Sequence, residues 1–204
     1  MLYLIHETIQ RIFWGLQKDI RQGMGTLEFT RVTRDVEQSD FDCGVASINQ
    51  YVKESYFPTI AQHAYAYAVM ARGTIVGYYM LMFREIELEI FPEEIAEIDP
   101  GIKDERLSAV HIRYLAIDKR YQGNKIGTSV LHVVMKQIED LAGQWPIRVI
   151  TIDAREDLLD WYAREGFRRM LKNSPGQDGI TTAMFFDCMK FSGELADYIN
   201  ENCM

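Results

Sequence analysis

The segment that most constrains the fold of this chain runs from Leu115 to Thr128. It reads as a short apolar strand, a basic turn that contains glycine, and the first turn of a helix. The helix that follows is amphipathic, because apolar residues recur every three or four positions. These positions are Val130, Leu131, Val133, Val134, Ile138 and Leu141. A strand, turn and helix in this order direct free backbone N–H groups at one point, and phosphate is a frequent ligand of such a point.

Two glycines make this turn suitable for a phosphate group. Gly123 and Gly127 have no side chain where a pyrophosphate would touch the backbone. Turns of this kind also serve packing alone, so the turn by itself indicates a phosphate site only weakly.

A second pattern lies downstream of the turn. Arg148 to Asp153 is a β-branched run that predicts a strand, and residues 156–165 predict a short helix. Gly166 stands where a helix C-cap is expected, and Phe167 follows it. The end of this helix, from Tyr162 to Phe167, therefore has the pattern Tyr-x-x-x-Gly-Phe.

Two further patterns lie nearer the N-terminus. Residues 41–44 read Phe-Asp-Cys-Gly, and a helix is expected over residues 45–55. Residues 75–81 read Ile-Val-Gly-Tyr-Tyr-Met-Leu and predict a buried strand.

In this order the patterns resemble the GCN5-related N-acetyltransferase (GNAT) family, in particular the branch of toxin-type acetyltransferases. The turn from Gln122 to Gly127 is similar to the family's acetyl-CoA loop, Gln/Arg-x-x-Gly-x-Gly/Ala. Lys125 stands where the middle glycine of the extended motif is common, and Arg155 lies near the place of a usual Asn. The resemblance covers about residues 26–187.

The resemblance implies an α/β (α+β) fold with a mixed, mostly antiparallel central sheet, splayed central strands and flanking helices. It implies acetyl-CoA as co-substrate and no metal. Backbone groups of Leu115 and Ile117 would then bind the pantetheine arm, with Arg120 or Lys125 adding charge at the pyrophosphate. The pyrophosphate itself would lie on Gln122, Gly123, Asn124, Lys125, Ile126, Gly127 and Thr128.

The resemblance also implies a catalytic role for Tyr162, as the general acid that protonates the departing thiolate. The acceptor would be a primary amine of a small molecule or peptide, which attacks the thioester directly. Two alternatives stay open: a toxin-type enzyme that acetylates aminoacyl-tRNA in a toxin–antitoxin pair, and a CoA-binding module without turnover. The base is also open between water and three side chains, namely Glu85, Glu87 and His111.

The composition narrows the class of protein. The net charge of −8 argues against nucleic acid as a partner and favours a cationic substrate. No apolar run approaches the roughly 20 residues that span a bilayer. The three cysteines are an odd number without metal-ligand spacing, which indicates a reduced cytoplasmic protein.

The chain divides into three expected parts. Residues 1–25 form an N-terminal extension, with an amphipathic helix over residues 2–21 that packs on its own domain or on a second copy, in a homodimer. Docking on a membrane surface is the alternative, although the three basic residues of this helix form only a weak basic face. Residues 26–190 are the acetyltransferase domain, with an acid- and proline-rich insertion at 91–107. Residues 191–204 are a tail with a short helix.

Overall fold

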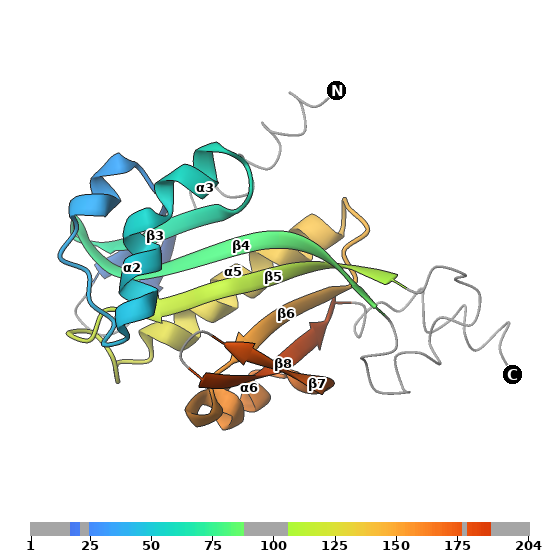
Figure 1. Cartoon of the computed structure of the whole chain (residues 1–204). Helices are drawn as coiled ribbons and strands as arrows, with labels where there is room; N and C mark the ends of the chain where they lie inside the picture. The colour runs from blue at the N-terminus through green and yellow to red at the C-terminus, as the bar shows by residue number, and fades with distance from the viewer. Residues whose placement is uncertain (1–16, 21–24, 88–105, 177–178, 189–204) are drawn as a thin grey trace, which may run out of the picture. The chain divides into compact units, whose positions relative to one another are not determined.

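A computed structural model describes residues 17–20, 25–87, 106–176 and 179–188 (Figure 1). The chain divides into two compact units. The first unit comprises residues 1–82 and 112–143, and the second comprises residues 83–111 and 144–204. Two long strands, β4 (Thr74–Glu87) and β5 (Arg106–Ile117), each contribute residues to both units.

The first unit contains four of the described strands in full or in large part, joined by hairpins and short helices. β1 (Gln17–Ile20), β2 (Gly25–Arg31), β3 (Tyr65–Ala71) and β4 pair in this order, and each pairing is antiparallel. Its helices are η1 (Arg34–Gln38), α2 (Ala46–Glu54), α3 (Tyr56–Ile60) and α5 (Ile126–Ala142).

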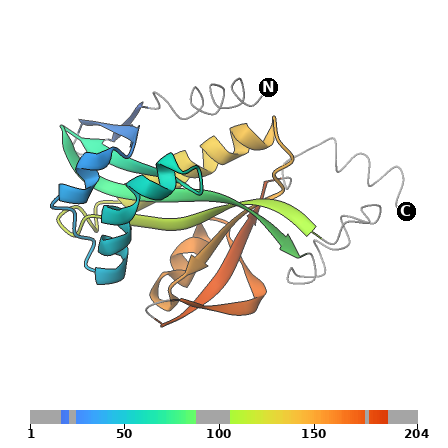
Figure 2. The ribbon, with the colours of Figure 1, turned by 45° about the horizontal axis from the view of Figure 1, so that its top comes forward.

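Helices cover both faces of the strands in the first unit (Figure 2). Side chains of β4 alternate between these faces, as a strand requires. Tyr78 belongs to the hydrophobic cluster that includes Val52 of α2. Tyr79 points the other way, and its hydroxyl donates a 3.2 Å hydrogen bond to Gln137 Oε1 of α5. The predicted apolar face of α5 is confirmed, because all six positions named above are buried.

Among the described residues, the second unit contains three complete strands and one helical segment, besides its parts of β4 and β5. β6 (Val149–Ala154) and β7 (Arg168–Gly176) each pair with β8 (Gly179–Asp187) in antiparallel register. The helical segment is η3 (Glu156–Leu158) followed by α6 (Leu159–Arg164). A buried ion pair joins two strand ends here, with Arg148 Nε 3.0 Å from Asp187 Oδ1.

Within the first unit the described strands follow the order β1-β2-β3-β4, and within the second unit they follow the order β6-β8-β7. Alternation of strands with flanking helices, and antiparallel register in the pairings above, confirm the predicted α/β fold with a mostly antiparallel sheet. The splay of two central strands stays a prediction.

Two local predictions are wrong. The helix expected over residues 2–21 does not extend through Gln17–Ile20, because this segment pairs with β2 as a strand. The second concerns residues 173–179, whose Gly, Pro, Asn and Asp content predicts a turn over the whole segment; the turn is shorter, since β7 continues to Gly176 and pairs there with Gly179. In both places pairing with a neighbouring strand outweighs the local pattern.

Several expectations lie outside the described residues. They are the rest of the N-terminal helix, most of the insertion at 91–107, and the C-terminal helix and tail. The N-terminal extension and the homodimer therefore stay predictions.

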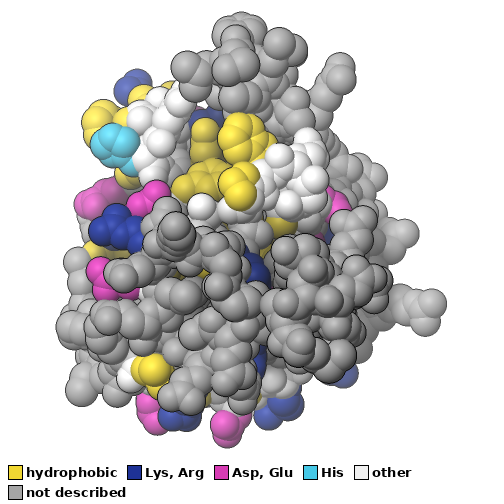
Figure 3. All heavy atoms as spheres, turned by 90° about the vertical axis from the view of Figure 1, so that its right-hand side faces the viewer, with side chains coloured by type: hydrophobic (Ala, Val, Ile, Leu, Met, Phe, Trp, Pro, Cys, Tyr) yellow, Lys and Arg dark blue, Asp and Glu magenta, His cyan; other side chains and the backbone are white. Residues whose placement is uncertain are grey.

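Some hydrophobic side chains reach the surface, as the face drawn in Figure 3 shows. Large examples within the described residues are Phe57 and Ile60 of α3, which are 68% and 55% exposed. No helix in the described ranges is long and apolar enough to cross a membrane.

Candidate functional site

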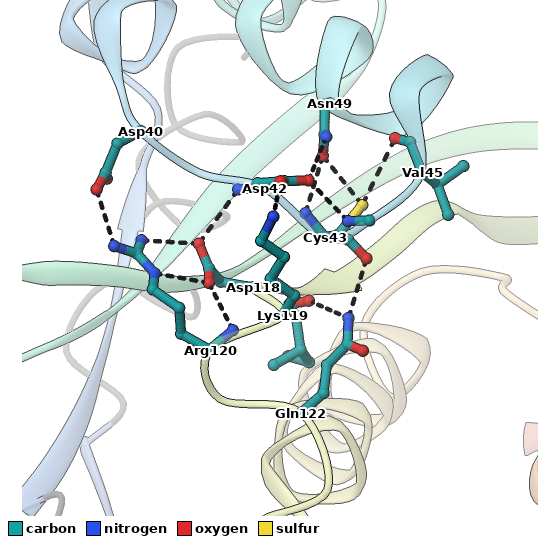
Figure 4. Close-up of polar contacts among 11 residues, drawn as sticks. Asp40, Asp42, Cys43, Val45, Asn49, Asp118, Lys119, Arg120 and Gln122 are labelled. Atoms are coloured by element: carbon teal, nitrogen blue, oxygen red, sulfur yellow. Dashed lines mark hydrogen bonds and ion pairs between the residues drawn. The ribbon is translucent and has the colours of Figure 1, made fainter.

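The turn between β5 and α5 is organised around a buried carboxylate, Asp118 (Figure 4). Asp118 Oδ1 accepts hydrogen bonds from the backbone N–H and Nε of Arg120, both at 2.9 Å. Asp118 Oδ2 accepts from Arg120 Nη2 at 2.8 Å and from the Asp42 backbone N–H at 3.2 Å. Because these donors favour the ionised form, above all the Arg120 guanidinium, they lower the pKa of Asp118.

Arg120 is also held from its other side. Its Nη1 donates a 2.8 Å hydrogen bond to Asp40, which lowers the pKa of that carboxyl. The guanidinium thus pairs with two carboxylates, a structural use of its charge. Of the two cations expected to assist at the pyrophosphate, Lys125 is therefore the better candidate.

The Phe-Asp-Cys-Gly segment forms the second half of the same network (Figure 4). Asp42 Oδ1 accepts from the Gly44 backbone N–H at 2.8 Å and from Asn49 Nδ2 at 2.7 Å. Asn49 Oδ1 in turn accepts from the Cys43 backbone N–H at 2.9 Å. Gly44 has a φ of 85°, where glycine is favoured. The ammonium of Lys119 pairs with Asp42 and is the main reason that the pKa of Asp42 is lowered.

Gln122 links the two halves of the network. Its Nε2 donates to the carbonyl oxygens of Cys43, at 3.0 Å, and of Ile117, at 2.8 Å. The Gln122 side chain therefore holds the turn against the N-terminal motif. We refer to the contacts among Asp40, Asp42, Cys43, Asn49, Asp118, Lys119, Arg120 and Gln122 as the turn network. Through this network the Phe-Asp-Cys-Gly segment contacts the turn after β5, although the two are more than 70 residues apart in the sequence.

The start of α5 has the features of an anion site. Lys125, its N-cap residue, lies in the left-handed region at φ 58° and its side chain does not cap the helix. Gly123 also has a positive φ, of 79°. The first turn contains no acidic residue, so nothing there repels an anion. Ile126 is buried and anchors the turn to the core, while Lys125 is exposed.

The other predicted loop residues take ordinary places around this helix start. Asn124 Nδ2 lies 3.3 Å from the carbonyl oxygens of both Tyr121 and Gln122, which closes the turn. Gly127 and Thr128 belong to the first turn of α5 and are partly exposed. Their contacts with a pyrophosphate stay predictions.

The end of β5 approaches β4 closely. A Cβ on Gly77 would lie 2.9 Å from Ile117 Cδ1 and 3.3 Å from the Ala116 carbonyl oxygen. The glycine of the Ile75–Leu81 segment therefore permits tight packing in the first unit. Leu115 is partly exposed and Ile117 is buried. Their pantetheine contacts stay predictions, and the Ile117 carbonyl already accepts the Gln122 bond.

Tyr162 lies in the second unit, on α6. Its ring makes edge-on contacts with Trp161 and Phe167, with centroids 4.5 Å and 5.6 Å away. Burial raises the pKa of the Tyr162 hydroxyl above its ordinary value, so the phenol keeps its proton at neutral pH. A general acid needs that proton. Gly166, at φ 93°, ends the helical segment, and a Cβ there would lie 3.2 Å from Phe186.

The three side chains considered as bases differ in their surroundings. Glu85 is exposed and lies 3.3 Å from Arg106 Nη1, and Glu87 is also exposed. His111 is buried, and both of its ring nitrogens lie near polar groups of the second unit. Asp153, which the sequence patterns did not single out, faces His111 Nε2 at 3.7 Å.

Arginine and tyrosine side chains pair repeatedly in the first unit. The guanidinium of Arg113 lies 5.5 Å and 6.0 Å from the ring centroids of Tyr114 and Tyr51, which stack on each other at 4.7 Å. Two further pairs are Arg31 with Tyr65 and Arg34 with Tyr56. We call these seven residues the Arg–Tyr set. Arg113 and Arg34 are exposed, and the tyrosines are partly exposed.

Comparison with known proteins agrees with this architecture. Residues 95–185 match a family model described as an acetyltransferase (GNAT) domain. No curated protein sequence matches the chain significantly.

Solved structures similar to this chain include several toxins. AtaT in complex with acetyl-methionyl-tRNAfMet has a TM-score of 0.67 and 22% identity, over 84% of this chain and 99% of AtaT. A Tyr-to-Phe mutant of KacT has a TM-score of 0.68 and 20% identity, over 84% of this chain and 98% of KacT. A structure described as a bacterial toxin has a TM-score of 0.67 and 19% identity, over 86% of this chain and 96% of the toxin. At these identities the likeness shows the fold.

The fold and the family match define the class of this protein as an acetyltransferase. The match to the GNAT domain covers residues 95–185, which is under half of the chain, and indicates an acetyl-CoA-dependent N-acetyltransferase.

Proposed function

We propose that this enzyme transfers the acetyl group of acetyl-CoA to the amino group of an aminoacyl-tRNA. The observation that carries this choice of acceptor is the Arg–Tyr set of the first unit. Guanidinium groups beside tyrosine rings can bind phosphates and stack on unpaired bases, both of which occur at the single-stranded end of a tRNA. AtaT, which has a similar fold, is complexed with acetyl-methionyl-tRNAfMet in a solved structure.

Through the Arg–Tyr set an acidic protein can still bind RNA. The net charge of −8 argues against RNA only if the charge is evenly spread. Arg31, Arg34 and Arg113 have tyrosine rings as neighbours, so basic and aromatic side chains occur together at three places in this unit. A small amine or peptide is the second candidate acceptor, because an acidic protein attracts cations.

In this proposal the turn network fixes the backbone that binds acetyl-CoA. The start of α5 binds the pyrophosphate, and Lys125 adds a positive charge. The pantetheine arm lies along Leu115 and Ile117. The amine attacks the thioester carbonyl, the carbon–sulfur bond breaks, and Tyr162 gives its proton to the thiolate. We place this reaction in the cytoplasm, where cysteines such as Cys43 and Cys188 stay thiols.

The test is acetyl transfer from labelled acetyl-CoA to a panel of acceptors. The panel contains total aminoacylated tRNA, uncharged tRNA, small primary amines and a lysine peptide. We expect label on the amino groups of charged tRNA and none on uncharged tRNA. Label confined to the small amines or the peptide would refute the RNA acceptor and leave the acetyltransferase assignment intact.

A matched pair of variants tests the role of the Arg–Tyr set. Arg113→Gln is expected to raise the KM for charged tRNA and reduce its salt dependence, because one cation at the RNA is lost. Lys136→Gln removes another exposed cation, on α5, where Lys136 pairs with Asp140, and should leave the KM unchanged. Equal effects of the two variants would contradict a specific contact.

A further inference from the structure

A polar cluster in the second unit is not explained by acetyl-CoA binding. It comprises Arg84 of β4, His111 of β5, and Thr151 and Asp153 of β6. His111 and Thr151 are buried, while the Asp153 side chain is 35% exposed. The cluster borders an apolar group that includes Ala109, Val149 and Phe185.

The contacts of the His111 ring fix where its proton lies. Arg84 Nη1 is 2.9 Å from His111 Nδ1, and the Thr151 hydroxyl is 3.0 Å from the same nitrogen. A guanidinium has only donors, so Nδ1 accepts its hydrogen bond, and the ring proton lies on Nε2. Nε2 faces Asp153 Oδ2 at 3.7 Å. The 3.7 Å separation is an ion-pair distance and is longer than a hydrogen bond, so His111 acts on Asp153 through its position and partial charge, while its Nδ1 lone pair is already occupied.

Asp153 keeps most of its accepting capacity. Within the described residues, its one polar contact is the ion pair with the His111 ring. A carboxylate has lone pairs for about four donors, so this one accepts more. Its neighbour across the strand pair is Ala183, whose small side chain leaves the carboxylate partly open to solvent. Tyr162, the proposed acid, belongs to the same unit.

We propose that Asp153 binds the ammonium group of the acceptor and removes its first proton, and that Arg84 and His111 are positioning residues for this carboxylate. The inference rests on the proposed acetyl transfer and names the group that receives the amine. The proton passes to Asp153, and the freed lone pair forms the carbon–nitrogen bond. The carbon–sulfur bond then breaks, and Tyr162 protonates the sulfur. Tyr162 then recovers a proton from the acceptor nitrogen, which loses its second N–H proton, and Asp153 releases its proton to water.

The experiment compares Asp153→Asn and Asp153→Glu with the unchanged enzyme, using whichever acceptor of the panel that enzyme modifies. Asp153→Asn is expected to lower kcat/KM for the acceptor by about 10²–10⁴-fold, as the loss of a catalytic base does, without changing the Kd of acetyl-CoA. Asp153→Glu, which keeps the carboxylate, should restore part of the activity. Asp140→Asn, in an exposed ion pair of α5, is the control and should keep full activity.

Two variants of His111 test the positioning role. His111→Gln retains an N–H donor near the place of Nε2, whereas His111→Leu removes it. We expect His111→Gln to retain more kcat than His111→Leu at equal acetyl-CoA affinity. A folded Asp153→Asn enzyme with unchanged kcat/KM would overturn the inference. The Asp153 variants are assayed with the acceptor that the unchanged enzyme modifies. If that acceptor is a small amine, the proposed tRNA acceptor is refuted, but the role of Asp153 is still tested.

Discussion

Replacing Asp118 with Asn tests whether the turn network holds the acetyl-CoA loop. The amide keeps one oxygen and replaces the other with an NH₂ group, which cannot accept. In the present orientation, Arg120 Nη2 and the Asp42 backbone N–H would lose their acceptor. A hydrogen bond to a charged group and a backbone hydrogen bond together contribute about 2–4 kcal/mol, and the lower end applies because the Arg120 side chain is 44% exposed. We therefore expect a loss of about 2 kcal/mol in the free energy of unfolding.

Urea unfolding measures this stability loss, and calorimetric titration measures the acetyl-CoA affinity of the folded variant. The affinity should also fall, because the freed turn must be ordered again on binding. Asp140→Asn is the control, since its exposed ion pair with Lys136 stabilises little. If Asp118→Asn matched Asp140→Asn in both measurements, the turn network would have no role in fixing the loop.

Four further predictions concern the loop, the acid and pH. Tyr162→Phe should lower turnover by about 10²–10⁴-fold and leave acetyl-CoA binding intact; parental turnover would exclude Tyr162 as the acid. Gly127→Glu should abolish acetyl-CoA binding by bulk and repulsion without unfolding, because an acid suits a helix N-terminus; unchanged affinity would place the pyrophosphate elsewhere. Lys125→Gln should weaken acetyl-CoA binding a few-fold, an effect that added salt should erase if charge is its cause. The pKa values of Asp118 and Asp40 are lowered in the folded state, so both carboxylates stabilise the fold above the unfolded carboxyl pKa of about 3.9, and this stabilisation is lost as the pH falls through the folded pKa values. In urea unfolding between about pH 6 and pH 3, the free energy of unfolding should therefore decrease less for Asp118→Asn than for the unchanged protein.

Much of the fold could be predicted from local patterns. The apolar face of α5 and the strand–turn–helix order around Gly123 both depend on residues close in sequence, where periodicity and glycine are reliable signals. The N-terminal strand Gln17–Ile20 could not be predicted in this way. Its apolar spacing fits a helix, and the decisive interaction is its pairing with β2.

The candidate site was predictable as a set of motifs but not as a network. The sequence patterns placed Asp42 and Gln122 in separate motifs and gave no role to Asp118. The structure joins them through contacts that span 76 and 79 residues in sequence. The same holds for Asp153, which is recognisable only because His111, more than 40 residues earlier, turns its Nε2 toward it. Such contacts are set by tertiary packing and leave no local periodicity.

The most direct test of the central claim is a calorimetric titration of the protein with acetyl-CoA, CoA and desulfo-CoA, beside the Gly127→Glu variant. We predict micromolar binding of all three ligands to the unchanged protein, because the pyrophosphate contacts at the start of α5 are common to them, and no binding to Gly127→Glu. Absence of binding to the unchanged protein, or equal binding to the variant, would contradict the claim that this loop holds the cofactor.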